Sequence, residues 1–84
     1  MRSLIELTNT RTVMTISDSE ALGVSGIQSD LKTFDALGAY GTSVLTAVTE
    51  LEAGRVVESS ELPASLVYKQ IDSVVSGVRI DAVK

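Results

Sequence analysis

The sequence GIQSDLKTFDALGAYGTSVLTAVT, from Gly26 to Thr49, holds the clearest secondary-structure signals of the chain. Its first half repeats apolar residues at the spacing of one helix face, namely Ile27, Leu31, Phe34 and Leu37. Gly38 is suited to end this helix in a left-handed conformation. The second half, from Thr42 to Thr49, is rich in β-branched residues and predicts a strand.

Turn and capping signals place the neighbouring elements. Ser25 and Gln28 have the spacing of a capping box, which predicts that the helix begins just after Ser25. A strand is predicted before the helix at Thr12–Ser17. After the strand that follows the helix, a turn at Glu52–Gly54 leads into a second short strand, Arg55–Glu58.

A second helix is predicted from Pro63, the only proline of the chain, to Gly77. Its apolar stripe comprises Val67, Ile71, Val74 and Val78. The segment Val78–Val83 alternates enough to form a further strand, and Leu4–Leu7 is an additional candidate at the N-terminus.

This order of elements predicts an α/β fold with a small, mainly parallel sheet of three to four strands and two helices. We expect residues 1–84 to form a single partial domain. Residues 12–84 hold the predicted elements from the Thr12–Ser17 strand onward, and residues 1–11 are either an N-terminal strand or an extension.

Composition excludes several classes of function. The 84 residues include no Cys and no His, which excludes disulfides, thiolate metal sites and Ser-His-Asp or Cys-His catalysis. A net charge of −4 argues against nucleic-acid or polybasic membrane binding. No apolar run approaches the roughly 18 residues that span a bilayer. Because the charged start is also unlike a secretory signal, we expect a cytoplasmic protein with no nucleic-acid or membrane partner.

The Gly26–Thr49 stretch closely resembles the phosphomethylpyrimidine kinase pattern G-I-Q-A-D-L-K-T-F-x-A-L-G-x-Y-G-x-S-V-I-T-A-x-T. The resemblance continues at Gln70–Val74 and Val78–Lys84, so that it covers Val13 to Lys84. It implies the N-terminal part of a ribokinase-like fold. In this family the ATP site and the catalytic base lie in the C-terminal half. The resemblance therefore implies ATP and Mg²⁺ only if such a half completes the protein, and no cofactor for this chain alone.

The loop before the first helix departs from the family pattern A-G-[ST]-D-x-S-G-G-A-G. Residues Ser17–Gly26 read SDSEALGVSG, with Asp18 at the first glycine and Glu20 at the aspartate. Leu22 replaces the serine and Val24 replaces one glycine of the pair. Valine does not readily adopt the positive φ that glycine allows. Asp18 also places negative charge where a phosphorylated pyrimidine would pass.

One family contact to the pyrimidine is kept and another is lost. The family glutamine that reads the pyrimidine edge aligns with Leu51, which cannot form hydrogen bonds. Asp30 matches the family, and the resemblance implies that it binds substrate. Its plainer interpretation is a solvated acid at the positive end of the helix dipole. No catalytic and no metal-binding residue is predicted.

Other candidate sites have ordinary explanations. Gly23 and Gly26 precede a helix, where backbone N–H groups can bind an anion, but an ordinary turn is favoured here. Two lysines that could contact phosphate are interpreted as a helix-surface residue and as the last residue of the chain, Lys32 and Lys84. Three carboxylates could hold a hard cation, but their spacing gives no support: Asp18, Glu20 and Glu50.

Two hypotheses of function remain. One is a truncated, non-catalytic binding or assembly module related to thiamin pyrimidine metabolism. The other is the N-terminal fragment of a split hydroxymethylpyrimidine/phosphomethylpyrimidine kinase that needs a separately encoded C-terminal half. The first is favoured, because the departures lie in ligand loops whereas the matching residues lie on packing faces: Leu31, Phe34, Leu37, Val44, Ile71 and Val74.

We also expect the chain to associate with itself. Two helices can hardly cover both faces of a sheet of three or four strands. The strand Val44–Val48 carries apolar residues on both sides, as strands buried on both faces do. Open edges and apolar surface favour a homodimer or a larger symmetric assembly.

Overall fold

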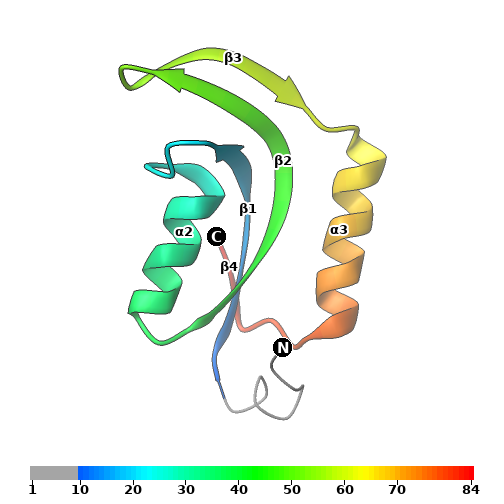
Figure 1. The fold of residues 1–84 in the computed structure, drawn as a ribbon. Coiled ribbons are helices and arrows are strands. Elements are labelled where there is room, and N and C mark those ends of the chain that lie inside the picture. Colours follow the sequence, from blue (N-terminus) through cyan, green and yellow to red (C-terminus); the bar gives the residue numbers. More distant parts are fainter. Residues whose placement is uncertain (1–9) are drawn as a thin grey trace.

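The computed structural model describes residues 10–84, which form an α/β fold in the order β1–α2–β2–β3–α3–β4 (Figure 1). The strands are Thr12–Glu20 (β1), Tyr40–Glu52 (β2), Arg55–Glu61 (β3) and Ala82–Val83 (β4), and the helices are Gly26–Ala36 (α2) and Ala64–Gly77 (α3). The sheet order is β3-β2-β1-β4. β1 pairs in parallel with β2 and β4, whereas β3 is antiparallel to β2. The predicted fold class is confirmed. The candidate strand Leu4–Leu7 lies outside the described residues.

The strands β1 and β2 form the centre of the sheet. Their parallel register runs from Thr12 opposite Tyr40 to Ser17 opposite Leu45. An irregularity follows, after which Ser19 is opposite Val48. Because pairing resumes there, β1 continues beyond the predicted end at Ser17 and delivers Glu20 to the carboxyl edge of the sheet.

The helix α2 packs closely on this pair of strands. A Cβ added at Gly41 of β2 would come within 2.7 Å of the Leu31 side chain and 3.0 Å of the Phe34 side chain. Gly38 has φ +79° and ends the helix as predicted. The prediction that Leu37 belongs to the packing face is wrong, because the helix ends at Ala36 and Leu37 is 79% exposed.

A tight hairpin joins β2 to β3. Ala53 and Gly54 both have positive φ, at 52° and 79°, which is the geometry of a two-residue hairpin turn. The turn is therefore confirmed, and β3 continues to Glu61, beyond the predicted end at Glu58. Figure 1 shows the hairpin arching over the carboxyl end of β1.

The helix α3 follows β3 directly, with Pro63 at its N-cap. It contacts β2, and Figure 1 shows α2 and α3 on opposite sides of that strand. The Gln70 side chain bonds both backbone groups of Leu45. Its Oε1 accepts from the Leu45 N–H at 2.9 Å and its Nε2 donates to the Leu45 carbonyl at 2.8 Å. One side chain thus bonds the backbone of β2 at Leu45, which lies before the β2 residues that pair with β3.

The last strand, β4, is shorter than predicted. Only Ala82 and Val83 are strand residues, although Val78–Val83 was expected to form one. At Asp81, the carboxylate accepts a hydrogen bond from the Thr12 N–H at 2.8 Å, while the Asp81 N–H donates to the Thr12 carbonyl at 2.9 Å. A side chain thereby takes a ladder position at Asp81. The Lys84 N–H nevertheless donates to the Met14 carbonyl, and the Ile16 N–H to the Lys84 carbonyl.

Burial is confined to the centre of the fold. Each buried residue lies in β1, α2 or β2, among them Met14, Ile27, Val44 and Ala47. No residue of β3, α3 or β4 is buried. Within residues 10–84, no helix is long and apolar enough to cross a membrane.

Candidate functional site

The loop that joins β1 to α2 is organised around the carboxylate of Glu20. One oxygen accepts a hydrogen bond from the Leu22 N–H at 2.8 Å and the other from the Ser25 N–H at 2.9 Å. Glu20 is only 1% exposed. A side chain of the chain itself therefore occupies two N–H groups of the loop whose Gly23 and Gly26 were considered as an anion site.

These contacts favour the ionised form of Glu20. The backbone hydrogen bond from Ser25 is the main cause that lowers the pKa of Glu20 below its ordinary value. Burial acts in the opposite direction, and the amide of Leu22 adds to the lowering. The carboxylate thus serves as an internal anion that fixes the loop.

The predicted capping box is wrong. Ser25 is the N-cap residue of α2, but its side chain makes no capping hydrogen bond. Gln28 reaches back to β1, where its Oε1 accepts from the Glu20 N–H and its Nε2 donates to the Ser19 hydroxyl. Because Glu20 already binds the Ser25 N–H, and an ionised acceptor is stronger than an amide oxygen, the glutamine has no role at the cap.

The candidate substrate residue Asp30 faces inward from α2 and is 7% exposed. Its Oδ2 accepts a hydrogen bond from the Thr15 hydroxyl at 2.6 Å, and its Oδ1 accepts one from Lys84 Nζ at 2.5 Å. The interpretation of Asp30 as a solvated acid is therefore wrong. Its contact with a pyrimidine stays a prediction.

Sequence reasoning missed the role of Lys84, which was interpreted only as the end of the chain. The hydrogen bond from Lys84, followed by the one from Thr15, lowers the pKa of Asp30 below its ordinary value. The three residues come from β1, α2 and the end of β4, so the ion pair fastens the last strand to the core. No short-range signal links residues that are 54 positions apart.

Open cavities lie beside the β2–β3 hairpin, and two of them are described below. The first, called the loop cavity, has a volume of about 450 Å³ and lies between the loop after β1 and the hairpin. Its lining residues are Ala21, Leu22, Val48, Thr49, Glu50, Leu51, Glu58 and Ser60. Leu51, which replaces the family glutamine, lies in this lining, whereas Asp30 does not.

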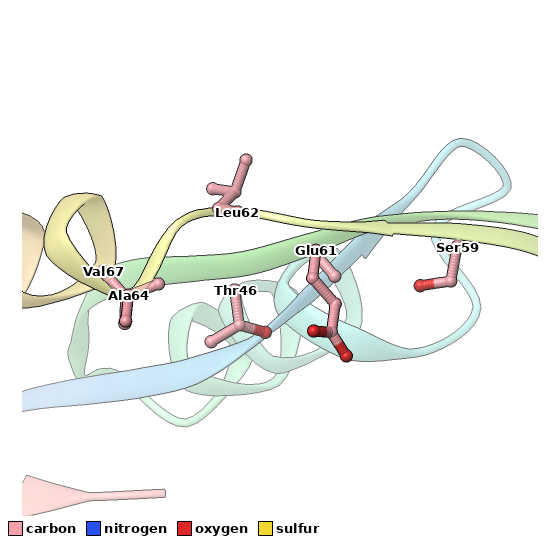
Figure 2. A pocket seen from close by; sticks show the side chains of 7 residues that line it. Thr46, Ser59, Glu61, Leu62, Ala64 and Val67 are labelled. Carbon is pink, nitrogen blue, oxygen red and sulfur yellow. The ribbon is translucent and has the colours of Figure 1, made fainter.

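The second, called the helix cavity, has a volume of about 360 Å³. Figure 2 shows its residues, with Ser59 and Glu61 on β3 and Ala64 and Val67 on the first turn of α3. Thr46, Ala47 and Leu62 complete the lining. The sequence did not predict this cavity, because its lining residues form no recognisable motif.

Metal binding has no support in the part of the chain that the structure describes. Residues 10–84 contain no group of three or more Asp or Glu side chains arranged to hold a metal ion. Of the three carboxylates considered from the sequence, Glu20 is bound by its own loop.

Comparison with known proteins agrees with the fold. The family model for phosphomethylpyrimidine kinase matches residues 20–84. The chain belongs to this family. It is 43% identical over 75 residues to the hydroxymethylpyrimidine/phosphomethylpyrimidine kinase of Rhizobium meliloti, covering 89% of this chain and 28% of the relative. The corresponding enzyme of Escherichia coli is 46% identical over 71 residues, covering 84% and 27%.

Solved structures show the same family relationship. A crystal structure of phosphomethylpyrimidine kinase from Clostridium difficile superposes with a TM-score of 0.80 at 40% identity, covering 86% of this chain and 33% of that one. The pyridoxal kinase of Staphylococcus aureus, in complex with AMP-PCP and pyridoxal, gives 0.79 at 32% identity, covering 88% and 28%. This member of the phosphomethylpyrimidine kinase family spans about 28% of the length of the first curated relative. It corresponds to an N-terminal segment of the family.

Proposed function

We propose that this chain is a non-catalytic binding or assembly module, built on the N-terminal segment of the phosphomethylpyrimidine kinase fold and related to thiamin pyrimidine metabolism. The observation that carries the proposal is the position of Glu20. Its carboxylate binds the Leu22 and Ser25 N–H groups, which would otherwise be open to an anionic ligand. Because its own carboxylate occupies these N–H groups, the loop is suited to a structural role and not to binding phosphate.

The use of Asp30 supports the same proposal. Both of its oxygens are engaged, one by Thr15 and one by Lys84. Asp30 of α2 therefore links β1 to the residue that follows β4. ATP and Mg²⁺ belong to the proposal only for a protein that also carries the C-terminal half of the fold, and the proposed location is the cytoplasm.

The first test is a coupled kinase assay on the purified chain with ATP and Mg²⁺. Hydroxymethylpyrimidine, its monophosphate and pyridoxine serve as substrates. We expect no turnover above background. Turnover that persists through a second purification would overturn the proposal.

The second candidate function, one half of a split kinase, is favoured by β4. In the described sheet this strand pairs only with β1, so its other edge is open to a further strand. The test mixes this chain with the Escherichia coli relative from which the matching N-terminal segment has been deleted. Turnover by the mixture, absent from either part, would establish the split kinase, whereas no turnover and no complex would leave the non-catalytic module.

Self-association is the remaining part of the proposal. All seven residues of β3 are exposed, including Val56 at 66% and Val57 at 54%, and β3 is an edge strand. Exposed edges pair with other chains, so we expect a homodimer or larger assembly. Sedimentation velocity over a dilution series measures this. A cooperatively folded monomer at sub-micromolar concentration would contradict it.

A further inference from the structure

The loop cavity combines apolar walls with paired carboxylates. We propose that it binds a small, positively charged molecule with an apolar body and discriminates against a phosphorylated one. This inference rests on the proposed binding function and names the class of ligand.

The apolar part of the cavity leaves large side chains exposed to solvent. Leu22 is 61% exposed and Val48 is 54% exposed, although both are large and apolar. Leu51 adds a third aliphatic side chain to the same lining. Removal of such apolar surface from water stabilises a complex. Apolar cavity walls with a few convergent polar groups are typical of small-molecule sites.

The charged part of the cavity comes from one pair of facing residues. Glu50 of β2 lies directly opposite Glu58 of β3 in the antiparallel ladder. Both line the loop cavity, as does the neighbouring cross-strand pair of Val48 and Ser60. Like charges directly opposite each other destabilise a sheet, and a cation between them relieves the repulsion. None of the described residues that line the cavity is basic.

The loop beside the cavity disfavours an anion. Leu22 lines the cavity, but its N–H is bound to Glu20, and so is the N–H of Ser25. A phosphate would have to displace a buried carboxylate from these donors. It would also meet the charges of Glu50 and Glu58. The site therefore selects for positive charge both by attraction and by the absence of free donors at these two positions.

Three probes of nearly identical shape test the charge preference on the intact chain. Benzamidinium is a cation, benzamide is neutral and benzoate is an anion. Titration at low salt, followed by the methyl resonances of Leu22, Val48 and Leu51, gives the affinity of each. We expect benzamidinium to bind about fivefold more tightly than benzamide, as is typical of exposed charge pairs. Benzoate is expected to be the weakest, and the difference should shrink as salt increases.

Charge-neutral variants locate the preference. Glu50→Gln and Glu58→Gln keep the shape of the side chains and should each reduce the advantage of benzamidinium over benzamide. Glu61→Gln is the matched control. Glu61 is also on β3, but it lines the helix cavity and not the loop cavity. It should leave the ranking unchanged. Equal loss in all three variants would overturn the inference, because the effect would then follow net charge and not position.

Several other outcomes would also contradict the inference. Tighter binding of benzoate than of benzamidinium, tighter binding of hydroxymethylpyrimidine monophosphate than of hydroxymethylpyrimidine, or no binding of any probe would each overturn the inference. Resonance shifts that follow protein dilution, and not added probe, would assign the cavity to a contact between copies and overturn it too. Failure of the proposed function is distinct, because it appears as turnover in the kinase assay whatever the order of the probes.

Discussion

The centre and the periphery of this fold differ in how far each is supported by its own contacts. β1, α2 and the middle of β2 contain each buried residue of the described chain. β3, α3 and β4 contain none. Both parts have regular secondary structure, so regularity alone does not show which part is stable by itself. The comparison shows that burial is concentrated in the centre, whereas the peripheral elements leave most of their surface to solvent.

Polar side chains also differ between the two parts, because they are buried in the centre and exposed in the hairpin. In the centre, Glu20, Asp30 and Thr15 are buried and each has hydrogen-bond partners within the chain. In the hairpin, Glu50 and Glu58 face each other at the surface. Buried charges must be paired, whereas surface charges remain available to a ligand or partner. The exposed carboxylates Glu50 and Glu58 therefore lie after Gly26–Thr49, the stretch that most closely resembles the family pattern.

The largest expected effect compares two glycines with left-handed φ. A Cβ at Gly26 would lie 2.4 Å from the Asp18 carbonyl oxygen, whereas nothing lies within 4 Å of one at Gly54. Gly54→Ala should cost about 1 kcal/mol, from backbone conformation alone. Gly26→Ala should cost about 4 kcal/mol, because the backbone clash adds to that cost. Urea unfolding followed by circular dichroism measures both, and equal costs would contradict the contrast.

A smaller effect compares two valines. Val44 on β2 is fully buried and Val75 on α3 is 51% exposed. Val44→Ala should lower the free energy of unfolding by about 2 kcal/mol, because it leaves a cavity in the centre. Val75→Ala should change it by less than about 0.5 kcal/mol in the monomer. A cost at Val75 that grows with protein concentration would show instead that α3 lies in an interface between copies.

The sequence predicted the elements that local patterns specify. The apolar spacing of Ile27, Leu31 and Phe34 located α2, and the left-handed Gly38 ended it. The resemblance of Gly26–Thr49 to the kinase pattern identified the family. Strand ends were predicted less well, because β1 and β3 continue through polar residues whose pairing depends on the neighbouring strand.

The site was harder to predict because its decisive contacts are made between distant residues or by unexpected partners. Glu20 was interpreted as a lost ligand residue, yet it binds the loop that follows it. Asp30 was considered as either a substrate contact or a solvated acid, and its bond to Lys84 requires the position of β4. Pattern matching compares each position with its family counterpart and does not reveal such pairings.

The smallest expected effect concerns the ion pair that joins centre and periphery. Lys84 Nζ binds Asp30 Oδ1, and the Lys84 side chain is 63% exposed. Solvent screening therefore limits the contribution of the pair to about 1 kcal/mol. Lys84→Met keeps most of the apolar side chain and removes the charge. It should lower the free energy of unfolding at neutral pH by that amount and raise the pKa of Asp30 toward its ordinary value.

The pH dependence separates loss of charge from loss of packing. Because the pKa of Asp30 is lowered in the folded state, its stabilisation is fully present above the unfolded-state pKa of about 4 and is lost as pH falls through the folded-state pKa. The difference between the native chain and Lys84→Met should therefore be constant above about pH 5 and should vanish in acid. Lost packing alone would give a difference that does not change with pH. Urea unfolding from pH 2 to pH 7 measures this, with Lys69→Met on the exposed surface of α3 as the control. If the Lys84→Met difference persists unchanged into acid, Lys84 holds β4 by contact and not by charge, and the electrostatic link between centre and periphery is wrong.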